Sequence, residues 1–281
     1  MSAISRLNHL GSTGLLGAVL LLLVVFLSLA APYLPIGSPT APSLVHRLAA
    51  PDLSAANLIM GTDQLGRDIF SRILYGGRIT LLVCFATLIV GGLFGVSVGL
   101  IAGYFGGWVD RVLMRILDMQ LSIPTMLFAL LVVAALGPDL VNLVLVMALA
   151  TWTQYARVVR GQVLSIRELD FIRSARSIGA GHIRIMLRHI LPNATGTIIV
   201  IATLELARLI LMEASLSFLG LGVPPPYPSW GRMLAEGRPY MIDAWWITAM
   251  PGLAIVFTVL GVNLLGDWLR DRLDPKLESR K

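Results

Sequence analysis

Long apolar runs, separated by polar segments, dominate the pattern of the chain. A helix needs about 20 apolar residues to cross a hydrocarbon core of about 30 Å. Six runs are close to that length, and each predicts a membrane-spanning helix. The expected spans are Leu15–Ala31, Ile79–Tyr104, Val112–Leu136, Leu140–Val159, Ala194–Leu219 and Trp245–Leu265. The pattern therefore predicts an all-α polytopic membrane protein.

Composition and charge agree with this class. Hydrophobic residues are 56% and charged residues 14% of the 281 residues, and the mean hydropathy is +0.80. Soluble domains carry about 25% charged residues. The net charge of +6 could suggest a nucleic-acid partner, but the arginines lie between the apolar runs, where topology accounts for them. We therefore expect no nucleic-acid binding. The single cysteine, Cys84, excludes an intrachain disulfide and a CxxC centre.

The distribution of positive charge predicts the orientation. With the N-terminus in the cytoplasm, the inward segments carry 15 Lys and Arg residues and the outward segments carry 6. This asymmetry predicts that both termini are cytoplasmic. Arg6, the first run and the sequence from Ser28 to Ala31 could also form a cleavable signal peptide, but the run is long for that purpose and favours a retained anchor.

The longest polar stretch, residues 157–193, lies between the fourth and fifth apolar runs. It carries seven arginines and two acidic residues, a charge of +5 that is typical of a cytoplasmic segment. Its apolar residues recur at helical spacing, Gly179-Ala180-Gly181 interrupts the pattern, and Pro192 should end it. Two short helices around a glycine elbow predict a surface on which another protein docks.

Span two carries Gly91, Gly95, Gly99 and Gly103, each four residues after the last. This spacing places the glycines on one helix face and predicts close helix contact. The contact could lie within the chain or against a partner subunit.

The fifth span contains Glu205, Arg208 and Glu213. A charge in hydrocarbon costs about 2.5 to 3.5 kcal/mol on insertion scales, so these side chains should face protein or water. Glu205 and Arg208 lie three residues apart on the helix and can reach each other. They either line a substrate path or form a buried structural pair.

No catalytic or metal site is expected. His189 has no Ser, Cys or acid placed to form a triad with it. Asp63 and Asp68 have no further ligands nearby, and we expect them to cap a helix and to pair with Arg67 or Arg72. The chain also lacks a GxxxxGK[ST] phosphate loop, so any use of ATP must occur on another chain.

Several longer motifs carry a family resemblance. They are GTDQLGRDIFSRILYGGR at 61–78, AGYFGGWVDRVLMR at 102–115, RHILPN at 188–193, EASLSFLGLGVPPP at 213–226 and LLGDWLRDRLDP at 264–275. In this order they resemble the permease subunits of ATP-binding-cassette importers for dipeptides, oligopeptides and nickel, and in particular the second, C-type permease of peptide importers.

The resemblance implies a type I importer permease fold of about six transmembrane helices with a cytoplasmic coupling-helix insert. The chain then divides into an anchor with an extracytoplasmic segment (1–75), a permease core with a coupling loop at about 160–193 (76–270) and a cytoplasmic tail (271–281). It also implies a prokaryotic inner membrane, a second homologous permease, two ATPase subunits that use ATP and Mg, an external substrate-binding protein and contact with lipid. No cofactor is implied on this chain itself.

The family's coupling pattern is Glu-Ala-Ala followed by a glycine. The matching residues here begin at Arg173 and continue through Ser174 and Ala175 to Gly179. The resemblance thus implies an ATPase-coupling role for Arg173, Ser174, Ala175, Gly179, Ala180 and His189. Arginine in place of glutamate reverses the charge, so the ATPase offers an acid or an apolar surface there, or Arg173 turns to lipid phosphates.

Together these features predict a permease for dipeptides or oligopeptides in which Glu205 and Arg208 lie on the translocation path. One alternative is a permease for nickel or another metal chelate, although no outer or spanning segment gathers a ligand set. A secondary transporter would show inverted repeats with interrupted spans. An integral-membrane enzyme would need a nucleophile, metal or paired carboxylates, which the sequence lacks.

Overall fold

The computed structural model describes residues 3–52, 54 and 58–273, and its regular structure there is helical apart from one bridge between Thr62 and Asp68. The α-helices are α1 (Ala3–Ala30), α2 (Ile69–Phe105), α3 (Gly107–Leu121), α4 (Thr125–Leu136), α5 (Leu140–Ile166), α6 (Asp170–Ser177), α7 (His182–Arg184), α8 (Leu191–Phe218), α9 (Trp230–Gly237) and α10 (Trp246–Leu273). Short 3-10 turns occupy Ala31–Tyr33, Leu44–His46 and Arg238–Tyr240, and a π-helical turn occupies Ile185–Ile190.

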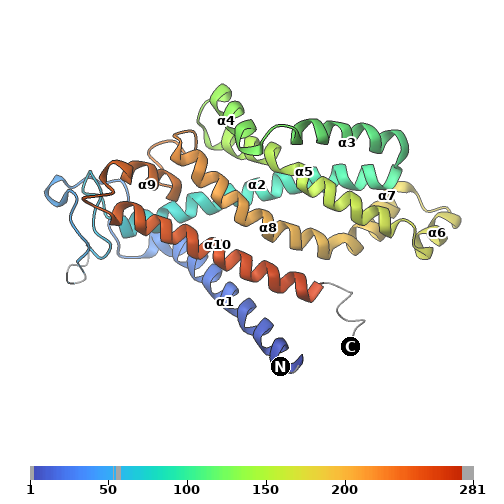
Figure 1. Ribbon diagram of the computed structural model, residues 1–281, viewed down its shortest axis with the longest axis horizontal. Helices are drawn as coiled ribbons and strands as arrows, with labels where there is room; N and C mark the ends of the chain where they lie inside the picture. Colours follow the sequence, from blue (N-terminus) through green and yellow to red (C-terminus); the bar gives the residue numbers. More distant parts are fainter. Residues whose placement is uncertain (1–2, 53, 55–57, 274–281) are drawn as a thin grey trace.

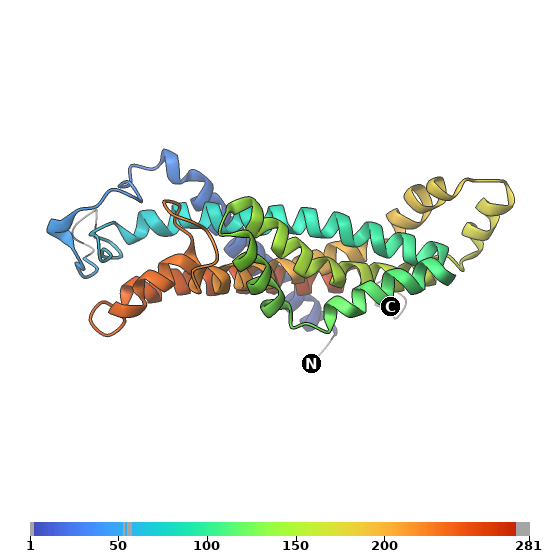
Figure 2. The same cartoon turned by 90° about the horizontal axis from the view of Figure 1, so that it is seen from above.

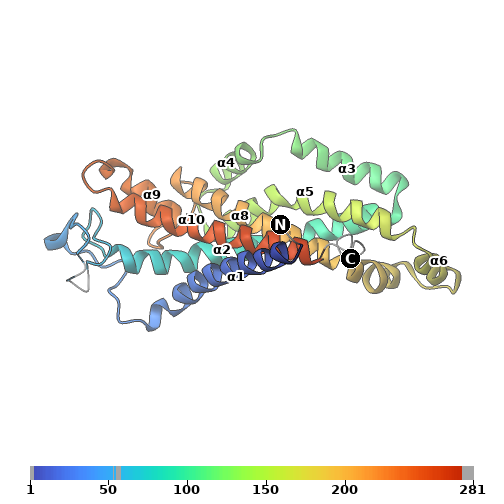
Figure 3. The ribbon, with the colours of Figure 1, turned by 60° about the horizontal axis from the view of Figure 1, so that its bottom comes forward.

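The helices form an elongated bundle in which α2, α5, α8 and α10 run along the long axis (Figure 1). The connection from α1 to α2 gathers with α9 at one end, whereas α6 projects at the other (Figure 2). Helix α1 lies along α10 (Figure 3). A Cβ added at Gly17 of α1 would lie 2.7 Å from the backbone nitrogen of Leu265, so the first span is packed tightly on the last.

The prediction of an all-α polytopic membrane protein is confirmed. Four helices of the described residues are long and apolar enough to span a membrane, namely Gly11–Tyr33, Ile69–Phe105, His182–Phe218 and Trp246–Leu273. Helices α3 and α4 make a fifth candidate if the bent pair is one span. Helix α5 corresponds to the remaining expected span, but Gln154, Arg157 and Arg160 make it less apolar than the others.

The third expected span, Val112–Leu136, is wrong as a single helix. Helices α3 and α4 meet at 84°. Pro124 immediately precedes α4, and proline cannot donate a backbone hydrogen bond or continue a helix that precedes it. The Ser122 hydroxyl also donates to the carbonyl of Met119 at 2.6 Å, which satisfies a backbone acceptor where α3 ends.

Pro192 does not end the helix that precedes it, contrary to the sequence prediction. The π-helical turn Ile185–Ile190 leads directly into α8, and Pro192 lies in the first turn of α8. The N–H of Leu191 bonds to the carbonyl of Met186 across the junction, so Pro192, which has no N–H, removes only one bond from a helix that otherwise continues. A π-helical turn also gives the backbone a place to adjust its hydrogen bonds.

The glycine face of α2 packs against α5 within the chain. A Cβ added at Gly95 would lie 2.3 Å from the carbonyl oxygen of Trp152, and one at Gly99 would lie 2.5 Å from that of Ala156. Gly103 meets the side chain of Val163 in the same way, at 2.8 Å. Such distances exclude any side chain, so the predicted close contact is confirmed and lies inside this subunit.

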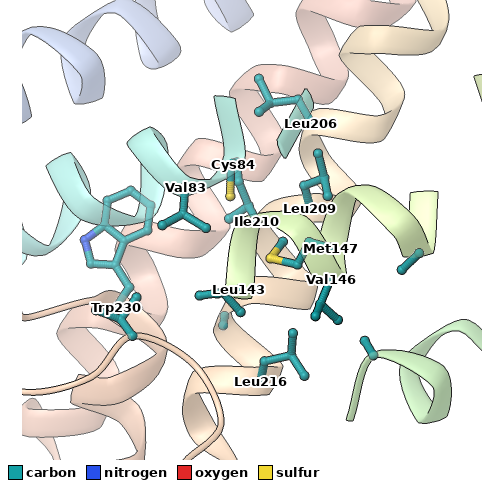
Figure 4. Packing of buried hydrophobic residues seen from close by; sticks show 14 of the residues in the cluster. Val83, Cys84, Leu143, Val146, Met147, Leu206, Leu209, Ile210, Leu216 and Trp230 are labelled. Atoms are coloured by element: carbon teal, nitrogen blue, oxygen red, sulfur yellow. The ribbon is translucent and has the colours of Figure 1, made fainter. Parts of the chain in front are cut away.

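The main apolar cluster joins α2, α5 and α8 (Figure 4). Its completely buried members include Val83, Cys84, Met147 and Ile210. Trp230, the first residue of α9, is 1% exposed, and its indole N–H donates to the carbonyl of Ile73 at 2.9 Å. Cys84 is therefore a packing residue, and Trp230 ties α9 to the start of α2.

A buried ion cluster joins the segment before α2 to α9. Asp63 is completely buried and pairs with Arg67 at 2.6 Å and also with Arg72. Both arginines reach Glu236, at 2.9 and 2.8 Å, and Arg232 pairs with Glu236 at 2.8 Å.

The neighbouring Asp68 has a different role, because it accepts hydrogen bonds from the N–H groups of Phe70 and Ser71 at the start of α2. The predicted capping and ion-pair roles of the two aspartates are confirmed.

The ion cluster fixes the charge of Glu236. Burial opposes ionisation of its carboxyl, but the charges of Arg72 and Arg67 and the hydrogen bonds from Arg232 and Arg72 outweigh burial and lower its pKa to about 2. The carboxyl is thus more acidic in the folded chain than its ordinary value of 4.5. Its contribution to stability is present above pH 4.5 and is lost as the pH falls towards 2.

We expect Gly95→Ala to destabilise the chain by about 1–3 kcal/mol, because the methyl group overpacks the contact with the backbone of α5. The measurement is the thermal unfolding midpoint of the purified chain in detergent. Gly161→Ala is the matched control, since Gly161 lies inside α5 with nothing within 4 Å of an added Cβ. The control should be neutral or stabilising by up to about 1 kcal/mol. Equal losses in both variants would contradict the packing role of Gly95.

We expect Glu236→Gln to destabilise the chain by about 2 kcal/mol or more, because Arg67 and Arg72 lose a charged partner in a buried site. Glu168→Gln is the control, since Glu168 is 61% exposed and pairs with Arg167 at the surface. An exposed pair contributes about 0–1 kcal/mol. Unfolding midpoints at pH 7 compare the two, and a loss no larger than that of the control would show that the cluster does not hold α9.

Candidate functional site

The polar insert forms two short helices around a glycine elbow, as the sequence predicts. Helix α6 ends at Ser177, and Gly179 follows with φ of +80°, a left-handed conformation that favours glycine. The Ala180 N–H donates to the carbonyl of Ala175 at 3.1 Å, which closes the end of α6. Helix α7 then begins at His182.

The residues of the coupling pattern take different positions on α6. Ala175 is buried, whereas Arg173 and Ser174 are exposed. The Arg173 guanidinium lies 3.5 Å from Glu168 and 3.9 Å from Asp170. The arginine that replaces the expected glutamate therefore has acidic neighbours in its own chain, which moderate its charge.

His189 lies apart from the other coupling residues, in the π-helical turn that leads to α8. Its backbone carbonyl accepts a hydrogen bond from the side chain of Asn193 at 2.6 Å. The five other residues, Arg173, Ser174, Ala175, Gly179 and Ala180, lie on α6 and its elbow.

A histidine that sequence reasoning missed, His182, connects the insert to α2. The ring Nδ1 of His182 lies 2.8 Å from the Tyr104 hydroxyl, in a hydrogen bond. The Arg176 guanidinium lies 5.2 Å from the centre of the Tyr104 ring, within range of a cation–π contact. Arg167 donates to the carbonyl of Gly103 at 2.7 Å. No local pattern marks these contacts, because their partners lie more than 60 residues apart.

An apolar cluster lies beneath these polar contacts. It joins Leu100 and Tyr104 of α2 to Val163 of α5, Ile172 of α6 and Ile185 before α8. All five side chains are buried. The insert is therefore packed on the C-terminal ends of α2 and α5, and α6 cannot move as a free loop.

Two arginines of the insert also hold α3 against α5. Arg160 makes two hydrogen bonds to the carboxylate of Asp110, one of them at 2.6 Å, and Arg157 lies 2.9 Å from Asp118. These side chains thus connect helices as well as adding positive charge to this end of the molecule.

Glu205 and Arg208 form an ion pair in α8, with 2.8 Å between Oε1 and Nη1. The Glu205 side chain is 3% exposed and the Arg208 side chain 67%. Both residues line a cavity of about 250 Å³. The other lining residues are Thr125 and Met126 of α4, Ala150, Thr151 and Gln154 of α5, and Met212 of α8.

Glu213 belongs to a separate site. It is completely buried and accepts hydrogen bonds from Ser217 at 2.7 Å and from Thr80 at 3.2 Å. The Ser217 hydroxyl also accepts from the N–H of Val223 at 3.2 Å. Glu213 therefore ties α8 to α2 and to the segment before α9. Among the described residues, no group of three or more His, Cys, Asp or Glu side chains is placed to hold a metal ion.

Curated relatives match almost the whole chain. It is 41% identical over 263 residues to a putative peptide transport system permease protein of Brucella suis, covering 94% of this chain and 88% of the relative. It is 40% identical to the di/tripeptide transport system permease protein DppC of Pseudomonas aeruginosa, covering 95% and 89%. It is 48% identical to the glutathione transport system permease protein GsiD of Pectobacterium atrosepticum, covering 78% and 73%.

Solved structures and a family model agree with these relatives. A chain of the MetNI methionine ABC transporter, in an inward-facing conformation, superposes with a TM-score of 0.60 at 20% identity and covers 73% of this chain and 98% of its own. The likeness confirms the importer permease fold. The family model for the binding-protein-dependent transport system inner membrane component matches residues 95–279. The chain therefore belongs to the family of binding-protein-dependent transport system inner membrane components, the permease subunits of ATP-binding-cassette importers, as its motifs indicated.

Proposed function

We propose that the chain is one of two permeases that together form the translocation path of an ATP-driven importer for dipeptides or oligopeptides. The observation that carries this proposal is the 40–41% identity to permeases named for peptide or di/tripeptide transport, over 94–95% of the chain. The relative named for glutathione, which is itself a small peptide, points to the same substrate class. The second permease is a homologous subunit, and a substrate-binding protein outside the membrane delivers the peptide.

The charge distribution supports an orientation in which both termini and the insert are cytoplasmic. The segment 157–188, which carries seven arginines, lies towards one end of the bundle (Figure 1). The opposite end then faces outward and carries the buried ion cluster and α9. This outer end offers the firmly held surface that docking of a substrate-binding protein requires.

In this proposal the complex contains two ATPase subunits that use ATP and Mg, because the chain has no phosphate loop of its own. The insert of this chain docks on one of them. The insert exposes apolar side chains suited to a protein partner, with Ile178 85%, Ile183 70% and Leu187 55% exposed. Ala180 keeps the elbow small, and the buried Ala175 holds it in place through the hydrogen bond from the Ala180 N–H. Arg173, Ser174 and His189 contribute polar groups to the contact.

Contacts within the chain can transmit a movement of the insert directly to the membrane helices. Because Arg176 and His182 both contact Tyr104, a shift of α6 or α7 is transmitted to the inner end of α2. Helix α2 is in turn locked to α5 along the glycine face. Closure of the ATPase pair would thus move α2 and α5 as one unit.

We expect cysteine labelling to place the two ends on opposite sides of the membrane. In a Cys84→Ser background, expressed without ATPase subunits, Ser177→Cys should react with a membrane-impermeant maleimide only from the cytoplasmic side. Ile242→Cys should react only from outside, and Ile242 is 94% exposed. Intact cells and inverted vesicles provide the two conditions. The reverse pattern would overturn the proposed orientation.

We expect Gly179→Val to uncouple the importer and Gly179→Asn to preserve coupling. The left-handed elbow strains a side chain by about 1–2 kcal/mol, and more when it is β-branched, whereas asparagine tolerates it. Loss of the docking conformation should lower substrate-stimulated ATP hydrolysis of the complex about tenfold in the valine variant. Size-exclusion chromatography of the complex measures assembly. Full stimulation in a normally assembled Gly179→Val complex would show that the elbow does not couple ATP hydrolysis to transport.

A further inference from the structure

Glu205 is a buried acid with few partners. A carboxylate has about four acceptor positions, but the described residues supply Glu205 with one hydrogen bond, from Arg208. Charge within a membrane is costly unless polar groups surround it. Glu205 also lines the 250 Å³ cavity, so a ligand that enters the cavity meets an acid with spare acceptor capacity.

The cavity walls combine hydrogen-bonding groups with adaptable apolar ones. Thr151 donates its hydroxyl hydrogen to the carbonyl of Met147 at 2.9 Å, which leaves its oxygen free to accept. The described residues give the Gln154 amide no hydrogen bond, although Gln154 is only partly exposed. Met126 and Met212 complete the wall with flexible side chains that fit apolar groups of different shape. Such a site suits a cation that carries a variable side chain.

The size of the cavity limits what can enter it. Pockets for whole drug-sized ligands span about 300–1,000 Å³, and this one is about 250 Å³. It therefore suits a very short peptide or one end of a longer one. The acid at its wall selects the end that carries an ammonium group.

We infer that this cavity binds the free amino end of the peptide in transit, with Glu205 accepting hydrogen bonds from the ammonium group. The inference rests on the proposed function and adds a recognition site to it. When the cavity is empty, Arg208 neutralises Glu205 through the 2.8 Å pair. When the ammonium enters, it replaces the guanidinium, and Arg208, whose side chain is 67% exposed, turns towards the peptide carboxylate. The pair between Glu205 and Arg208 is replaced by two pairs, one between Glu205 and the ammonium and one between Arg208 and the peptide carboxylate. No charge in the membrane is then unpaired.

Glu213, on the same helix, has a purely structural role and provides a comparison for Glu205. It is completely buried and accepts hydrogen bonds from two hydroxyl groups of its own chain. A permanent pair between the two permeases would account for Arg208 alone, but it would not call for an acid and an unbonded amide on the wall of a cavity. Glu213→Gln is therefore the matched control for Glu205→Gln.

The experiment measures protection of a cysteine at the cavity wall. The whole importer without its substrate-binding protein is placed in nanodiscs, with Cys84→Ala and Thr125→Cys, and alkylation by a small maleimide is followed. Dialanine and dialanine amide should slow alkylation, whereas N-acetyl-dialanine should not, because its amino end carries no charge. Glu205→Gln should raise the dialanine concentration needed for protection about tenfold or more, through loss of a charge-assisted hydrogen bond. Glu213→Gln should leave it unchanged.

Protection by N-acetyl-dialanine equal to that by dialanine, or no protection by either, would overturn the inference. If the Glu205→Gln complex fails to assemble, the same protection assay on the Arg208→Gln variant tests the inference instead. This variant should be protected at a lower concentration of dialanine amide, which has no carboxylate for Arg208 to bind, since the ammonium no longer competes with the guanidinium. A higher concentration needed for protection would overturn the inference. Uptake of dialanine by the complete importer in proteoliposomes is measured alongside. Uptake without protection refutes the cavity site alone, whereas no uptake of any dipeptide or oligopeptide refutes the proposed function.

Discussion

The close contact between α2 and α5 is the constraint on which the rest of the structure depends. Where Gly95 meets the backbone of Trp152, no side chain separates the two helices. This approach places the middle of α5, with Thr151 and Gln154, against α8 and the cavity. It also brings the C-terminal ends of α2 and α5 together, where the insert packs. One glycine face therefore positions both the proposed peptide site and the proposed ATPase-coupling surface.

Features coded by local spacing could be predicted from the sequence. The apolar runs, the glycine face, the Asp68 cap and the elbow at Gly179 each depend on residues within a few turns of one another. The single span expected over Val112–Leu136 and the helix end expected at Pro192 are wrong. In both cases the outcome depends on how the backbone beside a proline satisfies its hydrogen bonds, and residue type alone does not determine that.

The site was predictable only in part for the same reason. The pairing of Glu205 with Arg208 follows from their spacing on one helix, but the cavity beside them requires α4 and α5 to lie at particular angles. The contact of His182 with Tyr104 joins segments 78 residues apart. Glu236 likewise lies more than 160 residues from Arg67 and Arg72. Sequence spacing cannot reveal such pairs, because only the tertiary fold brings them together.

The two charged sites of the molecule differ in a way that suits their places in a transporter. At the end with α9, four of the five cluster members are less than 20% exposed. Two arginines hold Asp63 and three hold Glu236, so exchange of partners is costly. In the middle of α8, one buried acid holds one exposed arginine beside an open cavity. A docking surface benefits from the first arrangement. A translocation path must hold its substrate and then release it, which requires the second arrangement, a single pair that can exchange partners.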